Sequence, residues 1–189
     1  MKNSIKISVV ILAYSSFLSL QSIAQTTTKT ETYWSGVRLS IGAVAGIPIG
    51  SLKDNYNWNL GGSVQGDFPI VKDQLYATIN GGYDNFFAKN SSSMDDIHMI
   101  PVKGGLKYFP LKSFYVQGEA GASFITNRNS LGFNNSAVFV YAPQVGTLLN
   151  VGSNNYIDAG VRFEGNTKFY DGGSTNNFLS LRIAYAFGF

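Results

Sequence analysis

The stretch FLSLRIAYAFGF, residues 178–189, decides the fold of this chain. From Leu179 onward every second residue is large and apolar, and the residues between are small or polar. Because the side chains of a β-strand point alternately to its two faces, this pattern predicts a strand with one apolar face. The stretch has twelve residues, and a tilted strand needs about 9–11 residues to cross a bilayer.

The same stretch resembles the closing strand of bacterial outer-membrane β-barrels, whose alternating apolar residues and terminal aromatic residue are read by the barrel-assembly machinery. The resemblance implies a C-terminal assembly signal formed by Leu181, Ile183, Tyr185, Phe187 and Phe189. The alternative is an edge strand of a soluble β-sandwich. A soluble protein with such an edge would risk edge-to-edge aggregation, so the pattern favours a membrane barrel.

Seven further alternating runs precede this strand. We predict strands at residues 37–47, 58–68, 75–85, 98–109, 114–126, 138–149, 156–167 and 178–189. The expected fold class is all-β, an eight-stranded antiparallel up-and-down transmembrane β-barrel. The predicted connections alternate between long polar loops and short turns, which is typical of outer-membrane barrels with their turns in the periplasm. An even number of strands then places both the N- and C-termini in the periplasm and lets the first strand pair with the last.

Charged residues of these strands lie on the face opposite the apolar one. They are Arg38, Asp67, Asp84, Lys103, Lys107, Glu119, Asp158, Arg162, Glu164 and Arg182. A buried charge persists only when it is paired, so five charges of each sign on one face predict a closed lumen filled by a polar network. We expect Glu119 to pair with Lys103 or Lys107 on the neighbouring strand.

Aromatic residues gather near the ends of the predicted strands, as in the two interfacial belts of membrane barrels. The belt on the turn side is predicted to contain Tyr33, Trp34, Tyr108, Phe109, Phe114, Tyr115, Tyr156, Phe187 and Phe189. The belt on the loop side is predicted to contain Tyr56, Trp58, Phe86, Phe87, Phe169, Tyr170 and Phe178.

The N-terminal residues predict export. Residues 1–24 have the form of a cleaved signal peptide, with Lys2 and Lys6 before an apolar run and small residues at Ser22 and Ala24. Residues 25–35 are expected to form a short periplasmic leader, and residues 36–189 the barrel. Without Lys2 and Lys6 the chain has 12 basic and 11 acidic residues. This balance gives no indication of a nucleic-acid partner. The chain has no cysteine, which excludes a disulfide framework.

The stretch IPVKGGLKYFPLKSFYVQGEAGASF, residues 100–124, resembles the central hairpin of small eight-stranded outer-membrane β-barrel domain proteins, the OmpX-like and OmpA-transmembrane-domain-like group. The resemblance implies a multi-pass barrel in the bacterial outer membrane. It implies no catalytic residues, because that group has none in common.

Three functions are compatible with this sequence. We expect a structural or surface-interaction protein, an adhesin for example, that acts through its extracellular loops. One alternative is a passive carrier of small hydrophobic molecules, as in OmpW-like barrels. A minor alternative is an enzyme at the outer rim that uses His98 as a base. The expected partners are outer-membrane lipid, the barrel-assembly machinery and an extracellular protein or other surface ligand. A monomer without catalytic residues, cofactor or metal is expected.

Overall fold

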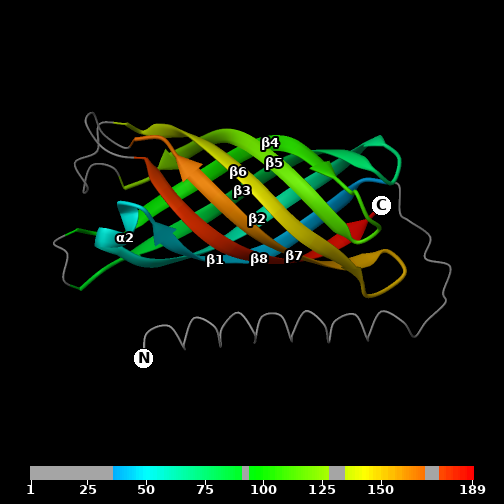
Figure 1. Ribbon diagram of the computed structural model, residues 1–189, viewed down its shortest axis with the longest axis horizontal. Coiled ribbons are helices and arrows are strands. Elements are labelled where there is room, and N and C mark those ends of the chain that lie inside the picture. The colour runs from blue at the N-terminus through cyan, green and yellow to red at the C-terminus, as the bar shows by residue number, and fades with distance from the viewer. Residues whose placement is uncertain (1–35, 91–93, 128–134, 169–174) are drawn as a thin grey trace, which may run out of the picture. The chain divides into compact units, whose positions relative to one another are not determined.

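The computed structural model describes residues 36–90, 94–127, 135–168 and 175–189 (Figure 1). The predicted signal peptide and the leader, residues 1–35, lie outside the described residues. Among the described residues, no helix is long and apolar enough to cross a membrane.

The described residues form one closed barrel of eight antiparallel strands, each paired with its neighbours in sequence order. The strands are β1 (Arg38–Ile49), β2 (Tyr56–Val71), β3 (Leu75–Ala88), β4 (Ile97–Tyr108), β5 (Phe114–Ile125), β6 (Ala137–Asn150), β7 (Asn155–Asn166) and β8 (Asn176–Gly188). A four-residue helix, α2 (Leu52–Asn55), lies between β1 and β2. The predicted fold class is therefore confirmed.

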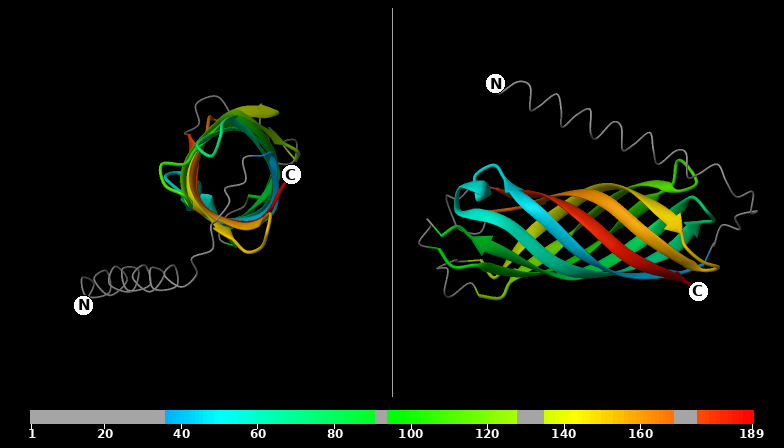
Figure 2. Two further views of the ribbon diagram at one scale, coloured as in Figure 1. Left: turned by 90° about the vertical axis from the view of Figure 1, so that its right-hand side faces the viewer. Right: turned by 90° about the horizontal axis from the view of Figure 1, so that it is seen from below.

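Closure of the barrel comes from β1 and β8, whose pairing runs from Arg38 opposite Gly188 to Ile49 opposite Asn177. The start of β1 and the end of β8 therefore lie at the same end of the barrel (Figure 2). The short connections after β2, β4 and β6 are also at this end, which we call the turn end. The connections after β1, β3, β5 and β7 lie at the opposite end, the loop end, and all four are longer than those at the turn end.

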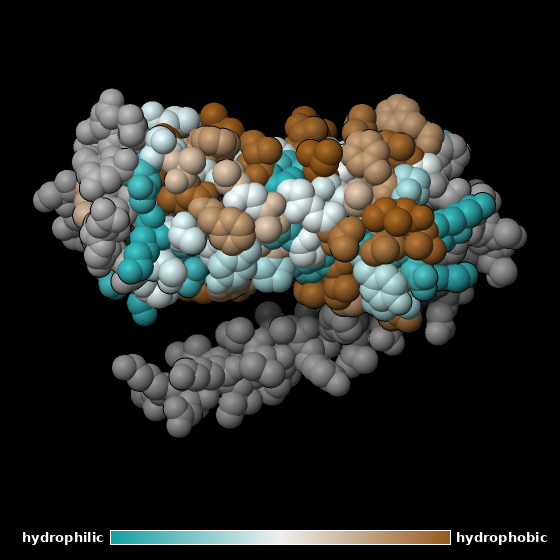
Figure 3. Space-filling model, turned by 90° about the horizontal axis from the view of Figure 1, so that it is seen from above, coloured by the Kyte–Doolittle hydropathy of each residue, from teal (hydrophilic) through white to brown (hydrophobic). Residues whose placement is uncertain are grey.

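The outer face of the barrel is apolar along its strands. Large apolar side chains there are strongly exposed: Ile41, Ile79 and Ile183 have exposed fractions of 59%, 60% and 51%. Figure 3 shows hydrophobic side chains spread over the wall and hydrophilic residues gathered toward the two ends. The inner face carries the buried polar residues, as the alternation predicted.

Strand boundaries differ from the sequence prediction mainly at the loop end. There β1 continues to Ile49, β2 begins at Tyr56 and β6 begins at Ala137. The sequence analysis also missed α2, which has no periodicity long enough to be recognised, because it is a single turn whose only buried residue is Leu52.

Candidate functional site: the barrel interior and its loop-end rim

All ten charged residues predicted to face the lumen are buried inside the barrel. Their exposed fractions range from 0% for Lys107 and Arg182 to 7% for Asp84. The other seven are Arg38, Asp67, Lys103, Glu119, Asp158, Arg162 and Glu164. We call these ten charged side chains the lumen polar network.

The centre of the network is Lys107 on β4. Its Nζ atom lies 2.9 Å from Asp67 Oδ2 and 3.1 Å from Asp158 Oδ2, so one ammonium group joins β2 to β7 across the lumen. Arg182 on β8 approaches the same Asp158 oxygen at 3.3 Å. Two further hydrogen bonds hold its guanidinium, from Nε to Ser63 Oγ and from Nη2 to Ser40 Oγ, both 2.9 Å long.

Tyr115 on β5 is also bound to Asp158. Its hydroxyl donates to Asp158 Oδ1 over 2.6 Å and accepts a hydrogen bond from the Gln144 amide. Two glycines make room for this hydroxyl: a Cβ atom added to Gly146 or Gly160 would lie 2.4 or 2.7 Å from it. The glycines on β6 and β7 thus leave space for the Tyr115 ring to extend into the lumen.

Nearer the loop end, Glu119 pairs with Arg162 on β7 at 3.4 Å, and Lys103 pairs with Glu164. The prediction that Glu119 pairs with Lys103 or Lys107 was therefore wrong. In the β4–β5 register Glu119 lies opposite Gly105, and each lysine is displaced by two residues along β4. Because eight strands enclose a narrow interior, long side chains reach past the adjacent strand instead, from β5 to β7 and from β4 to β7.

The turn-end part of the network is built around Arg38. Its Nε atom lies 3.6 Å from Asp67 Oδ2, and its guanidinium carbon lies 4.2 Å from the centre of the Tyr76 ring and 5.1 Å from that of Phe109. Asp84 belongs to the loop-ward part, where it interacts electrostatically with Glu164 and Lys103. The network therefore extends along the lumen toward both ends.

Two apolar layers close the lumen above and below the charges. The loop-end apolar layer consists of Leu52, Tyr56, Phe86, Ile97, Met99, Ile125, Val138 and Phe178, all buried. The turn-end aromatic layer consists of Tyr76, Phe109, Tyr115, Leu148, Tyr156 and Ala186. The lumen is thus filled by apolar side chains at both ends and charged ones between them.

These layers correct the belt prediction. Six residues assigned to the belts point into the lumen instead: Tyr56, Phe86, Phe109, Tyr115, Tyr156 and Phe178. Their position along the strand was not enough to place them, because parity decides whether a ring at a strand end points outward or inward. Trp58, Phe87, Tyr108, Phe114, Phe187 and Phe189 are not part of the buried core. Tyr33, Trp34, Phe169 and Tyr170 lie outside the described residues.

The predicted assembly-signal residues alternate with buried ones along β8. Leu181, Ile183, Tyr185, Phe187 and Phe189 have exposed fractions of 39% to 66%, whereas Arg182, Ala184 and Ala186 are buried. The inside–outside assignment of this strand therefore agrees with the alternation in the sequence.

The stems of the loop-end connections are joined to one another by hydrogen bonds. They run from Ser51 Oγ to the Thr175 carbonyl, from the Tyr56 hydroxyl to the Asp95 carbonyl, from the Asn127 amide to the Asp96 carbonyl, and from the Asn135 amide to the Lys168 carbonyl. Each connection is thereby attached to both of its neighbours, so the four stems form a closed ring.

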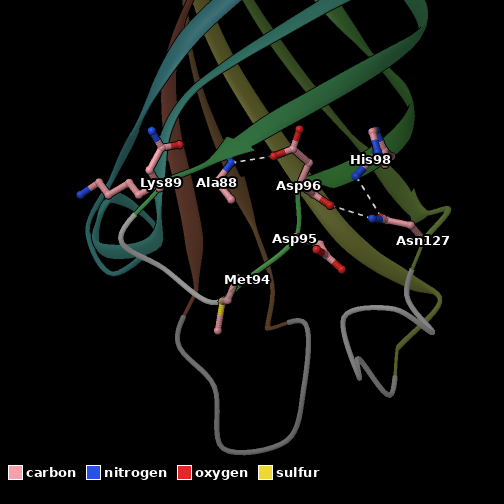
Figure 4. Close-up of a pocket in the computed structure, with 8 residues that line it drawn as sticks. Ala88, Lys89, Met94, Asp95, Asp96, His98 and Asn127 are labelled. Atoms are coloured by element: carbon pink, nitrogen blue, oxygen red, sulfur yellow. Dashed lines mark hydrogen bonds between the residues drawn. The ribbon is translucent and has the colours of Figure 1, made fainter.

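A pocket of about 680 Å³ lies on this ring, which we call the rim pocket (Figure 4). It is lined by Ala88, Lys89, Asn90, Met94, Asp95, Asp96, His98 and Asn127. The rim pocket includes the one histidine of the chain, which sequence reasoning had singled out.

His98 and Asp96 have structural partners in the rim pocket. The His98 ring Nδ1 lies 2.7 Å from the Tyr83 hydroxyl, and the Asp96 carboxylate accepts a hydrogen bond from the Ala88 backbone N–H. Among the described residues, no hydrogen bond or ion pair joins the His98 ring to a carboxylate. The acid–histidine pairing on which the enzyme hypothesis depends is therefore not seen here.

No protein-family model matches the sequence, and no curated protein matches it either. Solved structures match the barrel. OprG from Pseudomonas aeruginosa matches with a TM-score of 0.54 and 13% identity, over 85% of this chain and 99% of that one. Ail, the attachment invasion locus protein of Yersinia pestis, matches with 0.51 and 18%, over 81% and 99%. The outer membrane enzyme PagL matches with 0.52 and 12%, over 79% and 99%.

The chain has the fold of the small outer-membrane β-barrels. At these identities the likeness concerns the outer-membrane barrel fold alone. The three matched structures include an attachment protein and an enzyme, so the fold does not decide the function. Function has to be argued from the interior and the loop end of this barrel.

Proposed function

We propose that this protein is an integral outer-membrane barrel with a sealed interior that acts at the cell surface through its loop end. The observation that carries the proposal is the filling of the lumen, in which two apolar layers enclose the lumen polar network. Lys107, with an exposed fraction of 0%, links β4 to β2 and β7 across the lumen. Such an interior supports neither ion flow nor catalysis in the lumen, which leaves the loop end as the interacting surface.

The membrane location is supported by the outer face. Isoleucine, leucine, valine and aromatic side chains are exposed on all eight strands, and the charges of the strands point inward. A surface of this kind would aggregate in water and is stable in hydrocarbon, where a closed barrel also satisfies every backbone hydrogen bond. We infer a monomer surrounded by outer-membrane lipid and assembled through its last strand, with both termini in the periplasm.

Conductance measurements test the sealed interior. We expect the refolded protein, added to planar lipid bilayers, to insert without a steady large conductance. A porin of larger diameter, refolded and added in the same way, is the positive control for insertion and recording. Steady porin-like conductance by this protein would contradict the proposal.

Cell-surface display tests the role of the loop end. Cells that express the full-length chain should adhere to or capture an external ligand, and cells that express a variant with shortened loops should not. Equal surface display of the two chains is measured with an antibody to an inserted epitope. An epitope after residue 72 is detected after permeabilisation, and an epitope in the loop between β5 and β6 is detected on intact cells. Equal ligand capture by both chains would contradict a function in the loops.

One observation favours a second candidate, a carrier of small hydrophobic molecules. The interior is apolar at the loop end, which the sequence analysis did not predict. Its residues pack against one another, so a ligand would have to displace Leu52 or Phe178, which have exposed fractions of 6% and 1%. A fluorescent fatty acid that bound the refolded barrel, and more tightly after Leu52→Ala, would support the carrier. If the fatty acid bound neither the wild-type barrel nor Leu52→Ala, the carrier function would be excluded.

A further inference from the structure

Part of the polar surface of the rim pocket makes no hydrogen bond to the described residues of the barrel. The Asp95 backbone carbonyl accepts the Tyr56 hydroxyl, but no hydrogen bond within the described residues uses the Asp95 carboxylate. Asp96 is different, since its carboxylate binds the Ala88 N–H. In Figure 4 the Asp95 carboxylate and the Met94 side chain lie away from the bonded group formed by Ala88, Asp96, His98 and Asn127.

The floor of the rim pocket is held rigidly. Asn127 donates to the Asp96 carbonyl over 2.6 Å and accepts from the His98 N–H over 3.0 Å. The Lys89 N–H donates to the Asn55 carbonyl over 2.8 Å. These bonds tie the β3 and β4 ends to both neighbouring connections, so a ligand would meet a preorganised surface and little ordering would be needed on binding.

The charge of the loop end argues against a strongly charged ligand. The charged residues described in its connections are Lys53, Asp54, Lys89, Asp95, Asp96 and Lys168. Three are positive and three are negative, so this surface provides no field that would attract a polyanion or a polycation. The described uncharged polar residues of these connections are asparagines, serines and threonines, whose side chains both donate and accept hydrogen bonds.

These features together describe a binding site for neutral, hydroxyl-rich molecules. A carboxylate and an amide provide the acceptors and donors that sugar hydroxyls need, and the Met94 side chain provides a flexible apolar surface for the C–H face of a sugar ring. A volume of about 680 Å³ falls in the range of small-molecule sites, roughly 300–1,000 Å³.

We propose that the rim pocket binds an uncharged saccharide, with Asp95 and Asn90 as the hydrogen-bonding side chains. The proposal rests on the function proposed for the loop end and names its ligand class. Asp95 accepts hydrogen bonds from hydroxyl groups of the sugar, and Asn90 donates and accepts beside it. Lys89 and His98 border the site.

Binding to defined oligosaccharides tests the proposal. The refolded full-length barrel in nanodiscs is titrated with maltohexaose, chitotriose and lactose, and with heparin as a polyanion. We expect at least one uncharged oligosaccharide to bind. Asp95→Ala should weaken that binding by about tenfold or more, because a charged acceptor forms stronger hydrogen bonds than a neutral one. Asn90→Ala should weaken it as well.

Two further variants identify the ligand chemistry. Asp95→Asn keeps an acceptor and should retain most of the saccharide binding, whereas binding of a cationic ligand would be lost. Asp54→Ala changes an exposed acid of α2 that does not line the rim pocket, and should bind as the wild type does. Circular dichroism and the urea midpoint check that each variant folds.

The outcomes distinguish failure of the saccharide site from failure of the function proposed for the loop end. Binding of heparin alone, no binding of any of the three uncharged oligosaccharides, or binding unchanged in Asp95→Ala would overturn the proposal. In the last case saccharides bind elsewhere on the loop end, and the proposed surface function stands without the rim pocket. Steady conductance in bilayers would instead overturn the proposed function, whatever the saccharides do.

Discussion

At the scale of single residues, the buried ammonium group of Lys107 is held between two carboxylates. Lys107 is fully buried, and its Nζ atom lies within 3.1 Å of two carboxylates, those of Asp67 and Asp158. Taking an ammonium group out of water is costly, so it is stable here only because both partners are close. The same dependence applies in reverse, since both carboxylates lose a partner if Lys107 is removed.

We therefore expect Lys107→Met to lower the free energy of unfolding by about 3–5 kcal/mol, the cost of breaking a buried ion pair. The measurement is urea-induced unfolding of the refolded barrel, followed by circular dichroism. Lys72→Met in the exposed turn between β2 and β3 is the control and should change the free energy by less than about 0.5 kcal/mol. Similar midpoints for the two variants would show that the lumen polar network does not hold the barrel together.

Two glycines on adjacent strands give a second prediction at this scale. A Cβ atom on Gly105 would lie 2.0 Å from the Gly118 carbonyl oxygen, whereas a Cβ atom on Gly118 meets nothing within 4 Å. Gly105→Ala should therefore destabilise the barrel by about 1–3 kcal/mol or prevent refolding, as overpacking does. Gly118→Ala should refold with a nearly unchanged urea midpoint. Equal effects would contradict the described packing between β4 and β5.

At the scale of elements, the last strand tests which face meets lipid. Ile183 is exposed on the outer face and Ala184 is buried in the lumen. Ile183→Arg places a charge in hydrocarbon at a cost of about 2–4 kcal/mol near the midplane, so insertion into vesicles should fall sharply. Ala184→Ser adds a hydroxyl on the lumen side and should be tolerated. Vesicle flotation and urea unfolding measure the two effects, and equal behaviour would refute the assignment of faces.

Strands and faces could be predicted from the sequence because both depend on local alternation. Arg182 between Leu181 and Ile183 is enough to fix the two faces of β8. Cross-lumen partners could not be predicted in this way. Glu119 meets Arg162 because the sheet curves around β6 and turns the inner faces of β5 and β7 toward one another, and this curvature is not a property of either strand.

The rim pocket could not be predicted either. His98 was visible as a candidate, but its partners come from different elements. Tyr83 lies on β3, and Asn127 follows β5. Leu52 was likewise invisible, because one turn of helix has no pattern that separates a buried residue from its neighbours. Residues at the ends of strands depend most on tertiary context.

At the scale of the whole molecule, the two ends of the barrel differ in kind. The start of β1, the end of β8 and the short connections lie at the turn end. The hydrogen-bonded ring of connections and the rim pocket lie at the loop end. We expect the loop end to face the outside of the cell, so Lys53→Cys should react with a membrane-impermeant maleimide on intact cells. Lys72→Cys in a turn should react only after the outer membrane is permeabilised. The reverse pattern would contradict the orientation.

Spin labels along β8 test whether the apolar face of the barrel meets lipid while its charges face a sealed lumen. The chain has no cysteine, so single cysteines can be placed one at a time along residues 179–187 of β8 and spin-labelled in vesicles. Accessibility to oxygen, which concentrates in lipid, is then measured by electron paramagnetic resonance. We expect a period of two, with accessibility maxima at positions 179, 181, 183, 185 and 187. Maxima at the even positions, or no alternation, would contradict it.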